Sequence, residues 1–323
     1  MKIFSQLQKK IGKKVEKNIP LSIYSTFQLG GVAKYFFVAK NNQDVIKAAT
    51  CAQELSLNTF ILAGGSNLLI SDNGFDGLVI KMENRDAKII APNFIKAQSG
   101  VFLVNLSILA RDNSLSGMEW GADIPGTVGG AIRGNAGAFG CSMDQIVKSV
   151  EVLNLSDLKI SVFNNNDCHF GYRDSIFKHN KNFIILSGLF SLSVGVNSVI
   201  KAEMKKNLHY RTQNQPRQPS AGCIFQNIII NEDNLAKLKT IDKGVEEKIK
   251  GGKLGSAWLI DRAGLKGYTI GGAQVSHQHA NFIIKTGKNA RADHVLQLIS
   301  YIKQQVRDKY GIQLQEEIQY VGF

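Results

Sequence analysis

The chain has 323 residues, of which 44% are hydrophobic and 20% charged, so it is long enough for two or three domains with buried cores and is not intrinsically disordered. Its net charge of +13 fits nucleic-acid binding, a basic cleft for phosphorylated ligands, or lysines spread over solvated faces. Because no RNP-like aromatic motif and no zinc-finger spacing accompanies these charges, we expect no nucleic-acid partner.

The first half of the chain is predicted to alternate strands and helices. Short apolar runs predict strands at residues 34–39, 59–63, 77–82, 149–155, 159–163 and 183–192. Helical spacing of apolar residues predicts one helix that begins at Asn41 or Asn42 and another at 103–113. Ser156 and Asp157 predict the turn of a hairpin.

The composition changes near residues 195–222, where a basic helix at 199–210 leads into a polar segment at 213–220. Such a segment is typical of a domain boundary. Strands are predicted beyond it at 223–230, 280–285 and 312–321. An amphipathic helix is predicted from Asp293 to Gly311, and the fold class is therefore α+β.

Residues 72–77 with Glu83 resemble an EF-hand calcium loop. The third position is Gly74, which provides no ligand, and the flanking runs at 68–70 and 78–82 are typical of strands. We therefore predict a hairpin turn without calcium.

Four cysteines are scattered along the chain, at Cys51, Cys141, Cys168 and Cys223. They form no Cys-x-x-Cys pair and no histidine stands at zinc spacing, so we expect neither a metal nor a disulfide framework. This pattern fits a reducing cytosol. No apolar run reaches the roughly 18 residues that span a bilayer, and we expect a cytoplasmic protein with no membrane partner.

Two glycine-rich loops are the main candidates for function. The first, at 63–69, follows a predicted buried strand, and the second occupies 121–137. Amides without side chains can surround a diphosphate, although two ordinary tight turns would use the same glycines. Neither loop is a Gly-x-Gly-x-x-Gly or a P-loop motif, which disfavours a standard dinucleotide fold and a kinase.

Six segments occur in the order found in one family of flavin enzymes. They are residues 25–31, 64–69, 121–137, 171–177, 219–225 and 257–267. In this order, from about Ile19 to the C-terminus, the chain resembles the UDP-N-acetylenolpyruvoylglucosamine reductase (UDP-N-acetylmuramate dehydrogenase) family, in the branch that lacks an extra tyrosine lid loop.

The resemblance implies an FAD-binding fold of the vanillyl-alcohol-oxidase type. It implies an FAD-binding region at residues 1–195, split into two lobes near residue 85, and a smaller α+β substrate-binding domain at 196–323. It further implies that NADPH reduces FAD and that the flavin passes a hydride to the vinyl carbon of UDP-N-acetylglucosamine enolpyruvate, giving UDP-N-acetylmuramate for peptidoglycan. A UDP-sugar is then the small-molecule partner of a monomer with a role in cell shape, the cell cycle and division.

The arriving hydride places negative charge beside the substrate carboxylate, so a cation and a proton donor are needed there. The resemblance implies that Arg173 is the cation and that Glu317, with Glu316 as the close alternative, polarises the substrate. Cys223 stands where the family has its proton-donating serine, while Ser220 lies at an earlier position of the motif. A thiol pKa near ~8.5 suits a proton donor, although a buried structural cysteine is the alternative.

The remaining predicted site residues bind the cofactor or the substrate. The cofactor-binding set is Gly64, Gly65, Ser66, Asn67, Leu68, Gly126, Thr127, Gly129, Gly130, Gly134, Asn135 and Gly137. The substrate-binding set is Tyr172, Arg211, Asn227, Lys253 and Gln278. His277 and His279 are interpreted as structural. Two rival functions stay open: another FAD-dependent oxidase of this fold acting on an alcohol or hydroxy acid, and a basic nucleic-acid-binding protein.

Overall fold

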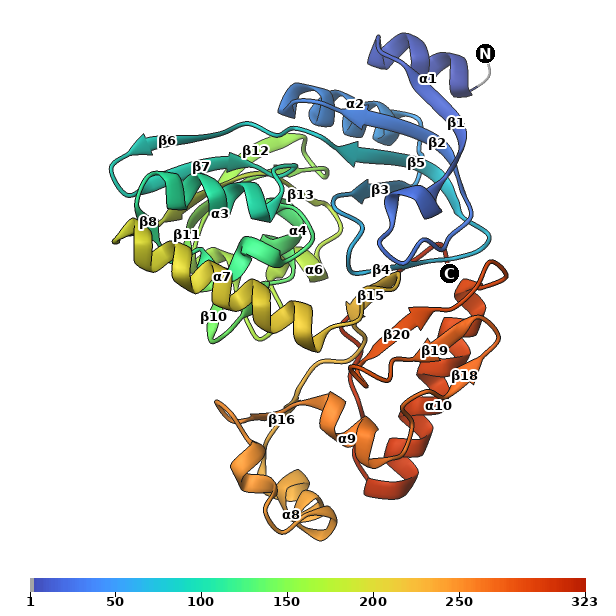
Figure 1. Ribbon diagram of the computed structural model, residues 1–323. Helices are drawn as coiled ribbons and strands as arrows, with labels where there is room; N and C mark the ends of the chain where they lie inside the picture. Colours follow the sequence, from blue (N-terminus) through green and yellow to red (C-terminus); the bar gives the residue numbers. More distant parts are fainter. Residues whose placement is uncertain (1–2) are drawn as a thin grey trace. The chain divides into compact units, whose positions relative to one another are not determined.

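The computed structural model describes residues 3–323, which form two compact units (Figure 1). The first unit contains the chain up to Ile19, Ala33–Gly65 and Phe75–Gln213. The second contains Pro20–Val32, Ser66–Gly74 and Asn214–Phe323. Among residues 3–323, no helix combines the length and the hydropathy that a membrane crossing requires.

The boundary between the units differs from the predicted position at residue 195. Helix α7 (Asn197–Asn214) belongs to the first unit. Asn197 Nδ2 donates to the carbonyl of Arg111 at 2.6 Å, and Ile200 is buried, so the start of α7 is fixed to the first unit. The polar segment at 213–220, rather than residue 195, therefore marks the change of unit.

The first sheet of the first unit has the strand order β1 (Val15–Pro20), β2 (Val32–Ala39), β5 (Phe75–Met82), β3 (Thr59–Leu62). Strands β2 and β3 both run parallel to β5. Helices α1 (Ile3–Ile11) and α2 (Asn42–Glu54) share the core of this sheet. Asn41 caps α2 by accepting the Asp44 N–H at 2.9 Å, which confirms the predicted helix start.

The second sheet has the order β12 (Lys159–Asn164), β11 (Val147–Asn154), β13 (Phe183–Ser191), β7 (Phe94–Gln98), β6 (Ala87–Ala91), and all its neighbours are antiparallel. Asn154 pairs with Lys159, which confirms the predicted hairpin. The chain leaves the first sheet at Met82 and begins the second at Ala87, where the sequence predicted a split near residue 85.

Short elements complete the first unit. Helix α3 (Leu103–Asp112) was predicted, and it shares the core of the second sheet. The others are β8 (Leu115–Ser116), η2 (Glu119–Asp123), α4 (Val128–Arg133), β9 (Gly137–Ala138), β10 (Cys141–Ser142), α5 (Met143–Ile146), η3 (Asn166–Cys168), α6 (Ile176–His179) and β14 (Ser193–Val194).

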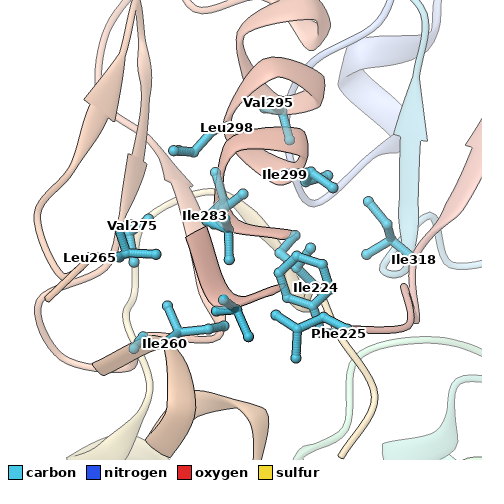
Figure 2. Close-up of a cluster of buried hydrophobic side chains, with 14 of the residues drawn as sticks. Ile224, Phe225, Ile260, Leu265, Val275, Ile283, Val295, Leu298, Ile299 and Ile318 are labelled. Atoms are coloured by element: carbon cyan, nitrogen blue, oxygen red, sulfur yellow. The ribbon is translucent and has the colours of Figure 1, made fainter. Parts of the chain in front are cut away.

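The second unit packs a helix against a small sheet of order β15 (Ser220–Cys223), β20 (Phe282–Lys285), β19 (Ala273–Val275), β18 (Thr269–Ile270). Helix α10 (Ala292–Tyr310) buries Val295, Leu298 and Ile299 in a common core with Ile224 and Ile283 (Figure 2). Gly311 ends α10 with a left-handed φ of 64°, as the sequence predicted.

The other elements of the second unit are short. They are η1 (Leu21–Tyr24), β4 (Leu68–Ile70), β16 (Ile228–Ile229), α8 (Glu232–Ile241), η4 (Val245–Lys248), β17 (Lys253–Leu254), α9 (Ser256–Arg262) and β21 (Gln319–Val321). The predicted strand at 312–321 is therefore too long, because β21 pairs only with the three residues of β4. The predicted strand at 223–230 is likewise interrupted between β15 and β16.

The predicted hairpin turn at 72–77 is wrong. Strand β4 pairs with β21, whereas β5 pairs with β2 and β3, so this segment connects two different sheets. Within the second unit, the Asp72 carboxylate accepts the N–H groups of Ala292 at 3.2 Å and Asp293 at 3.3 Å. Asp72 therefore caps the N-terminus of α10.

Candidate functional site

The two glycine-rich loops meet within the first unit. A Cβ placed on Gly64 would lie 2.6 Å from the Cα of Gly126, a distance that real side chains do not show. A Cβ on Gly130 would lie 3.8 Å from the Cβ of Ala63. The loops at 63–65 and 126–130 therefore contact each other, and we call this region of contact the loop junction.

Part of the second glycine-rich stretch is helical rather than a loop. Thr127 precedes α4, and the N–H groups of Val128 and Gly129 donate to the carbonyls of Val101 at 2.8 Å and Ser99 at 2.9 Å. These two amides hold the start of α4 and are not available to surround a diphosphate. The prediction that Gly129 binds the cofactor therefore rests on its place beside the loop junction, not on its N–H.

A buried hydroxyl at the loop junction fits a phosphate-bearing group. Thr127 is 2% exposed, and its Oγ1 finds no hydrogen-bond partner among residues 3–323. Leaving such a group unsatisfied costs about 1–3 kcal/mol. A Cβ on Gly130 would lie 3.9 Å from this Oγ1, so glycine leaves room beside it. An acceptor oxygen of a bound diphosphate would satisfy the hydroxyl.

The end of the second stretch supports the turn that carries Arg173. Asn135 has a left-handed φ of 41°, donates from Nδ2 to the Gly171 carbonyl at 2.8 Å and accepts the Asp144 N–H at 3.0 Å. The Gly137 carbonyl accepts from Arg173 Nη2 at 2.8 Å. Asn135 and Gly137 thus link the stretch to Arg173. Gly134 is different, because a Cβ there would meet only the Gly130 carbonyl at an ordinary 3.5 Å.

Arg173 lies in a tight turn in which Gly171 and Asp174 exchange two backbone hydrogen bonds of 3.0 and 3.1 Å. Its φ of 56° is left-handed, which costs roughly 1–2 kcal/mol for a residue with a side chain. Its carbonyl accepts from Lys178 Nζ at 2.5 Å, and its guanidinium lies 5.7 Å from the centre of the Tyr172 ring. Such strain at a well-supported position is typical of functional residues.

Arg211 lies near the end of α7 and is half-enclosed, with its side chain 16% exposed. Its Nε lies 3.3 Å from Asp123 Oδ2, which joins the helix to the second glycine-rich stretch. Beside it, the ring of Tyr210 meets Phe139 edge to face, with centroids 5.6 Å apart. The first unit therefore brings one predicted substrate-binding residue to the same stretch that supports Arg173.

The second unit brings Cys223 and Glu317 together. Cys223 is half-buried, lies at the end of β15 and is not part of a disulfide. The Glu317 N–H donates to the carbonyl of the next residue, Ile224, at 2.7 Å. The Glu317 carbonyl accepts from Asn67 Nδ2 at 3.0 Å. Two hydrogen bonds therefore fix the backbone of Glu317, one of them to Ile224, the residue that follows Cys223.

The carboxylate of Glu316 contacts two other side chains. Its Oε1 lies 2.6 Å from Lys303 Nζ, and its Oε2 accepts from the Tyr320 hydroxyl at 2.6 Å. Burial and this carboxylate raise the pKa of Tyr320. The Glu316 carboxylate is thus part of a network with Lys303 and Tyr320.

The other predicted substrate-binding residues lie on short strands and turns of the second unit. Ile229 pairs with Lys253, and Asn227 is exposed just before this ladder, so Asn227 lies beside the strand pair that contains Lys253. Gln278 is exposed in the turn between β19 and β20, where its N–H donates to Ser276 Oγ at 3.1 Å. The structure therefore groups Asn227 with Lys253, on a ladder separate from the turn that carries Gln278.

Packing explains the two nearby histidines. The ring of His277 fills the space that a Cβ on Gly267 would need. His279 packs edge to face on Phe282 with centroids 4.8 Å apart, and burial lowers its pKa. Both contacts agree with the structural interpretation.

The sequence analysis did not single out Asp123 or Lys81. Asp123 became visible only through its contact with Arg211. Lys81 is 8% exposed, and its Nζ donates to the Ala63 carbonyl beside Gly64. One signal was present, because Lys81 interrupts the apolar run of β5.

Comparisons with known proteins cover both units. A model of an FAD binding domain matches residues 33–160, and a model of the C-terminal domain of UDP-N-acetylenolpyruvoylglucosamine reductase matches residues 214–321. The chain is 35% identical over 318 residues to the UDP-N-acetylenolpyruvoylglucosamine reductase of Anoxybacillus flavithermus, covering 98% of this chain and 97% of the relative. It is 36% identical over 310 residues to that of Caldanaerobacter subterraneus, covering 96% and 94%. The crystal structure of the Thermus caldophilus enzyme superposes with a TM-score of 0.76 at 28% identity, covering 95% of this chain and 99% of that one.

Proposed function

Because this chain belongs to the UDP-N-acetylenolpyruvoylglucosamine reductase family, we propose that Arg173, Cys223 and Glu317 carry its reaction. The chain is an FAD-containing oxidoreductase with an FAD-binding fold of the vanillyl-alcohol-oxidase type. With NADPH it reduces UDP-N-acetylglucosamine enolpyruvate to UDP-N-acetylmuramate in peptidoglycan precursor synthesis. The alternative of an alcohol or hydroxy-acid oxidase is not favoured, because the relatives that match nearly the full length are reductases.

The loop junction is the observation that supports the cofactor's position. The Thr127 hydroxyl and the space beside Gly130 suit the diphosphate of FAD. We propose that the residues holding FAD are Gly64, Gly65, Ser66, Asn67, Leu68, Gly126, Thr127, Gly129, Gly130, Gly134, Asn135 and Gly137. When bound, FAD supplies the hydride that reduces the enolpyruvyl group, after receiving it from NADPH.

Arg173 is proposed to stabilise the charge that develops on the substrate carboxylate. A guanidinium offers two parallel N–H donors to a carboxylate and stays charged at any working pH. Its turn, the Gly137 carbonyl and Lys178 hold Arg173 in place before substrate binds. A donor fixed in advance stabilises a developing charge better than one that must first reorganise.

Cys223 is proposed to hold a proton on Sγ and to give it to the carbon beside the substrate carboxylate. An unperturbed thiol is mostly protonated at neutral pH and is much more acidic than an alcohol. Glu317 is proposed to polarise the same substrate. The hydrogen bond from Glu317 to Ile224 supports the joint assignment, because it fixes the two residues near each other.

Recognition of the UDP-sugar is proposed to involve Tyr172, Arg211, Asn227, Lys253 and Gln278. We propose an FAD-binding role for the first unit and a substrate-binding role for Asn214–Phe323. The four cysteines form no disulfide among residues 3–323, which supports a reducing, cytoplasmic location. We propose that the protein is a monomer, and peptidoglycan synthesis would connect the enzyme to cell shape, the cell cycle and division.

The test is an NADPH-oxidation assay with and without the UDP-linked enolpyruvyl sugar. We expect yellow protein, with FAD released on denaturation, and NADPH consumption that depends on the sugar. Yellow protein that consumes oxygen but ignores the sugar would favour the oxidase. Colourless protein that takes up no FAD would contradict both flavin functions.

A further inference from the structure

Lys81 is a buried cation directly behind the first glycine-rich loop. It lies on β5 opposite Leu62 of β3, and only 8% of the residue is exposed. Its Nζ donates to the backbone carbonyl of Ala63, the residue before Gly64. The ammonium is therefore anchored at the position where the buried strand ends and the loop begins.

Burying the positive charge of the Lys81 ammonium costs free energy of folding. Burial lowers the pKa of Lys81, while Glu83 acts in the opposite direction and Arg85 in the same one. The carbonyl of Ala63 provides a hydrogen bond but no net charge. An apolar side chain of similar length would fill the same space without desolvating an ammonium. Packing alone would therefore not require a lysine at this position.

The loop junction lies directly next to this charge. Ala63, which accepts from Lys81, also lies beside Gly130, and Gly64 touches Gly126. The N–H groups of Val128 and Gly129 are already bonded to other carbonyls. A diphosphate carries about two negative charges, and a cation in a poorly solvated position acts on such a group more strongly than one in water.

We propose that Lys81 supplies positive charge that holds the diphosphate of FAD at the loop junction. This inference rests on the proposed function, because it requires FAD to lie there. It assigns Lys81 to the phosphate part of the cofactor and not to the isoalloxazine ring. A UDP diphosphate has the same chemistry, so the experiment must separate the two ligands.

The test compares apoprotein of the wild type, Lys81→Met, Lys81→Arg and the control Lys34→Met. Lys34 lies on the neighbouring strand β2 with its side chain 51% exposed. Flavin fluorescence quenching gives the Kd of FAD and of riboflavin, which has no phosphate, and calorimetry gives that of UDP. Calorimetry and fluorescence thus report binding without any turnover.

We expect Lys81→Met to weaken FAD binding roughly 10- to 100-fold while leaving riboflavin and UDP binding unchanged. Lys81→Arg should retain most of the FAD affinity, and Lys34→Met should retain all of it. The melting temperature of the Lys81→Met apoprotein should equal or exceed that of the wild type, because a desolvated charge is removed.

Three results would overturn the inference. If Lys81→Met lost equal affinity for FAD and riboflavin and its apoprotein melted at a lower temperature, Lys81 would be a structural support of Ala63. A loss of affinity for UDP alone would mean that the charge of Lys81 binds the substrate instead of FAD. A wild-type apoprotein that binds neither flavin would contradict the proposed function itself, which the first two results would not.

Discussion

At the scale of single residues, the acidity of the Cys223 side chain decides how it can work. A thiol with a pKa near ~8.5 carries its proton at neutral pH yet releases it far more readily than an alcohol. A serine at the same position would need more help from its surroundings to donate a proton. The exchange of oxygen for sulfur therefore keeps the function of a proton donor while changing its pH range and its reactivity.

Replacing Cys223 should separate the two half-reactions. Cys223→Ser should keep activity, whereas Cys223→Ala should reduce the rate of flavin reoxidation by substrate by roughly 10²-fold, a typical contribution of a general acid. Flavin reduction by NADPH should be unchanged in both. Stopped-flow absorbance measures each step. Cys141→Ala, at an exposed free thiol, is the control. Equal reoxidation in wild type and Cys223→Ala would reject the assignment.

The adjacent carboxylates should respond differently to amide substitution. Glu316→Gln removes the partly buried ion pair with Lys303 and should lower the free energy of unfolding by about 1 kcal/mol. Glu317→Gln should lower kcat by roughly 10²-fold. Denaturant unfolding and steady-state kinetics measure the two effects. The reverse pattern would assign the catalytic role to Glu316.

At the scale of elements, the meeting of the two glycine-rich loops allows a matched pair of substitutions. Gly64→Ala would place a methyl group 2.6 Å from the Gly126 Cα and should lower the free energy of unfolding by about 1–3 kcal/mol. Gly134→Ala meets only an atom at 3.5 Å and should not. Denaturant unfolding of the apoproteins tests this. Equal stability of the two variants would mean that the loops do not touch as described.

Elements with local signals were predictable from the sequence. Asn41 caps α2 and Gly311 ends α10 because each acts on the nearest turn of its own helix. Asp72 shows the limit of such reasoning. The residues that follow Asp72 in the sequence predict a hairpin turn, but the Asp72 carboxylate caps α10, a helix more than two hundred residues later in the chain. No local pattern encodes that contact.

The same limit applies to the candidate site. The motifs around Arg173, Cys223 and Glu317 identified these residues as candidates from the sequence. Their supports could not be predicted, because the bonds of Asn67 to Glu317 and of Gly137 to Arg173 depend on tertiary structure. Lys81 was missed for the same reason, since a lysine in an apolar strand reads as an ordinary surface residue until its burial is known.

At the scale of the whole molecule, the second unit is assembled from three separate parts of the chain. Its core includes Phe27 and Leu29 from the first part and Leu69 from the second, all at most 4% exposed. Strand β21 finds its partner, β4, in the second part. The third part, Asn214–Phe323, therefore does not contain all the side chains of the core in which it is buried.

A fragment of residues 214–323 should not fold by itself. Loss of three large buried side chains removes roughly 2–5 kcal/mol each, which approaches or exceeds the whole stability of a domain of this size. Circular dichroism during heating should show no cooperative transition in the fragment, and one in the full chain. A fragment that melts cooperatively near the temperature of the full chain would show that residues 20–32 and 66–74 are dispensable.

This three-part assembly also has a consequence for biosynthesis. A ribosome releases the segments around Phe27 and Leu69 long before most of the residues that complete their core, from Ala221 to Ile318, have been translated. Until then these apolar side chains have no permanent cover, which favours aggregation of a nascent chain or its capture by chaperones. A stop codon just before Gln319 would in addition leave β4 without its partner strand, and it should reduce the yield of native protein although every proposed active-site residue would still be made.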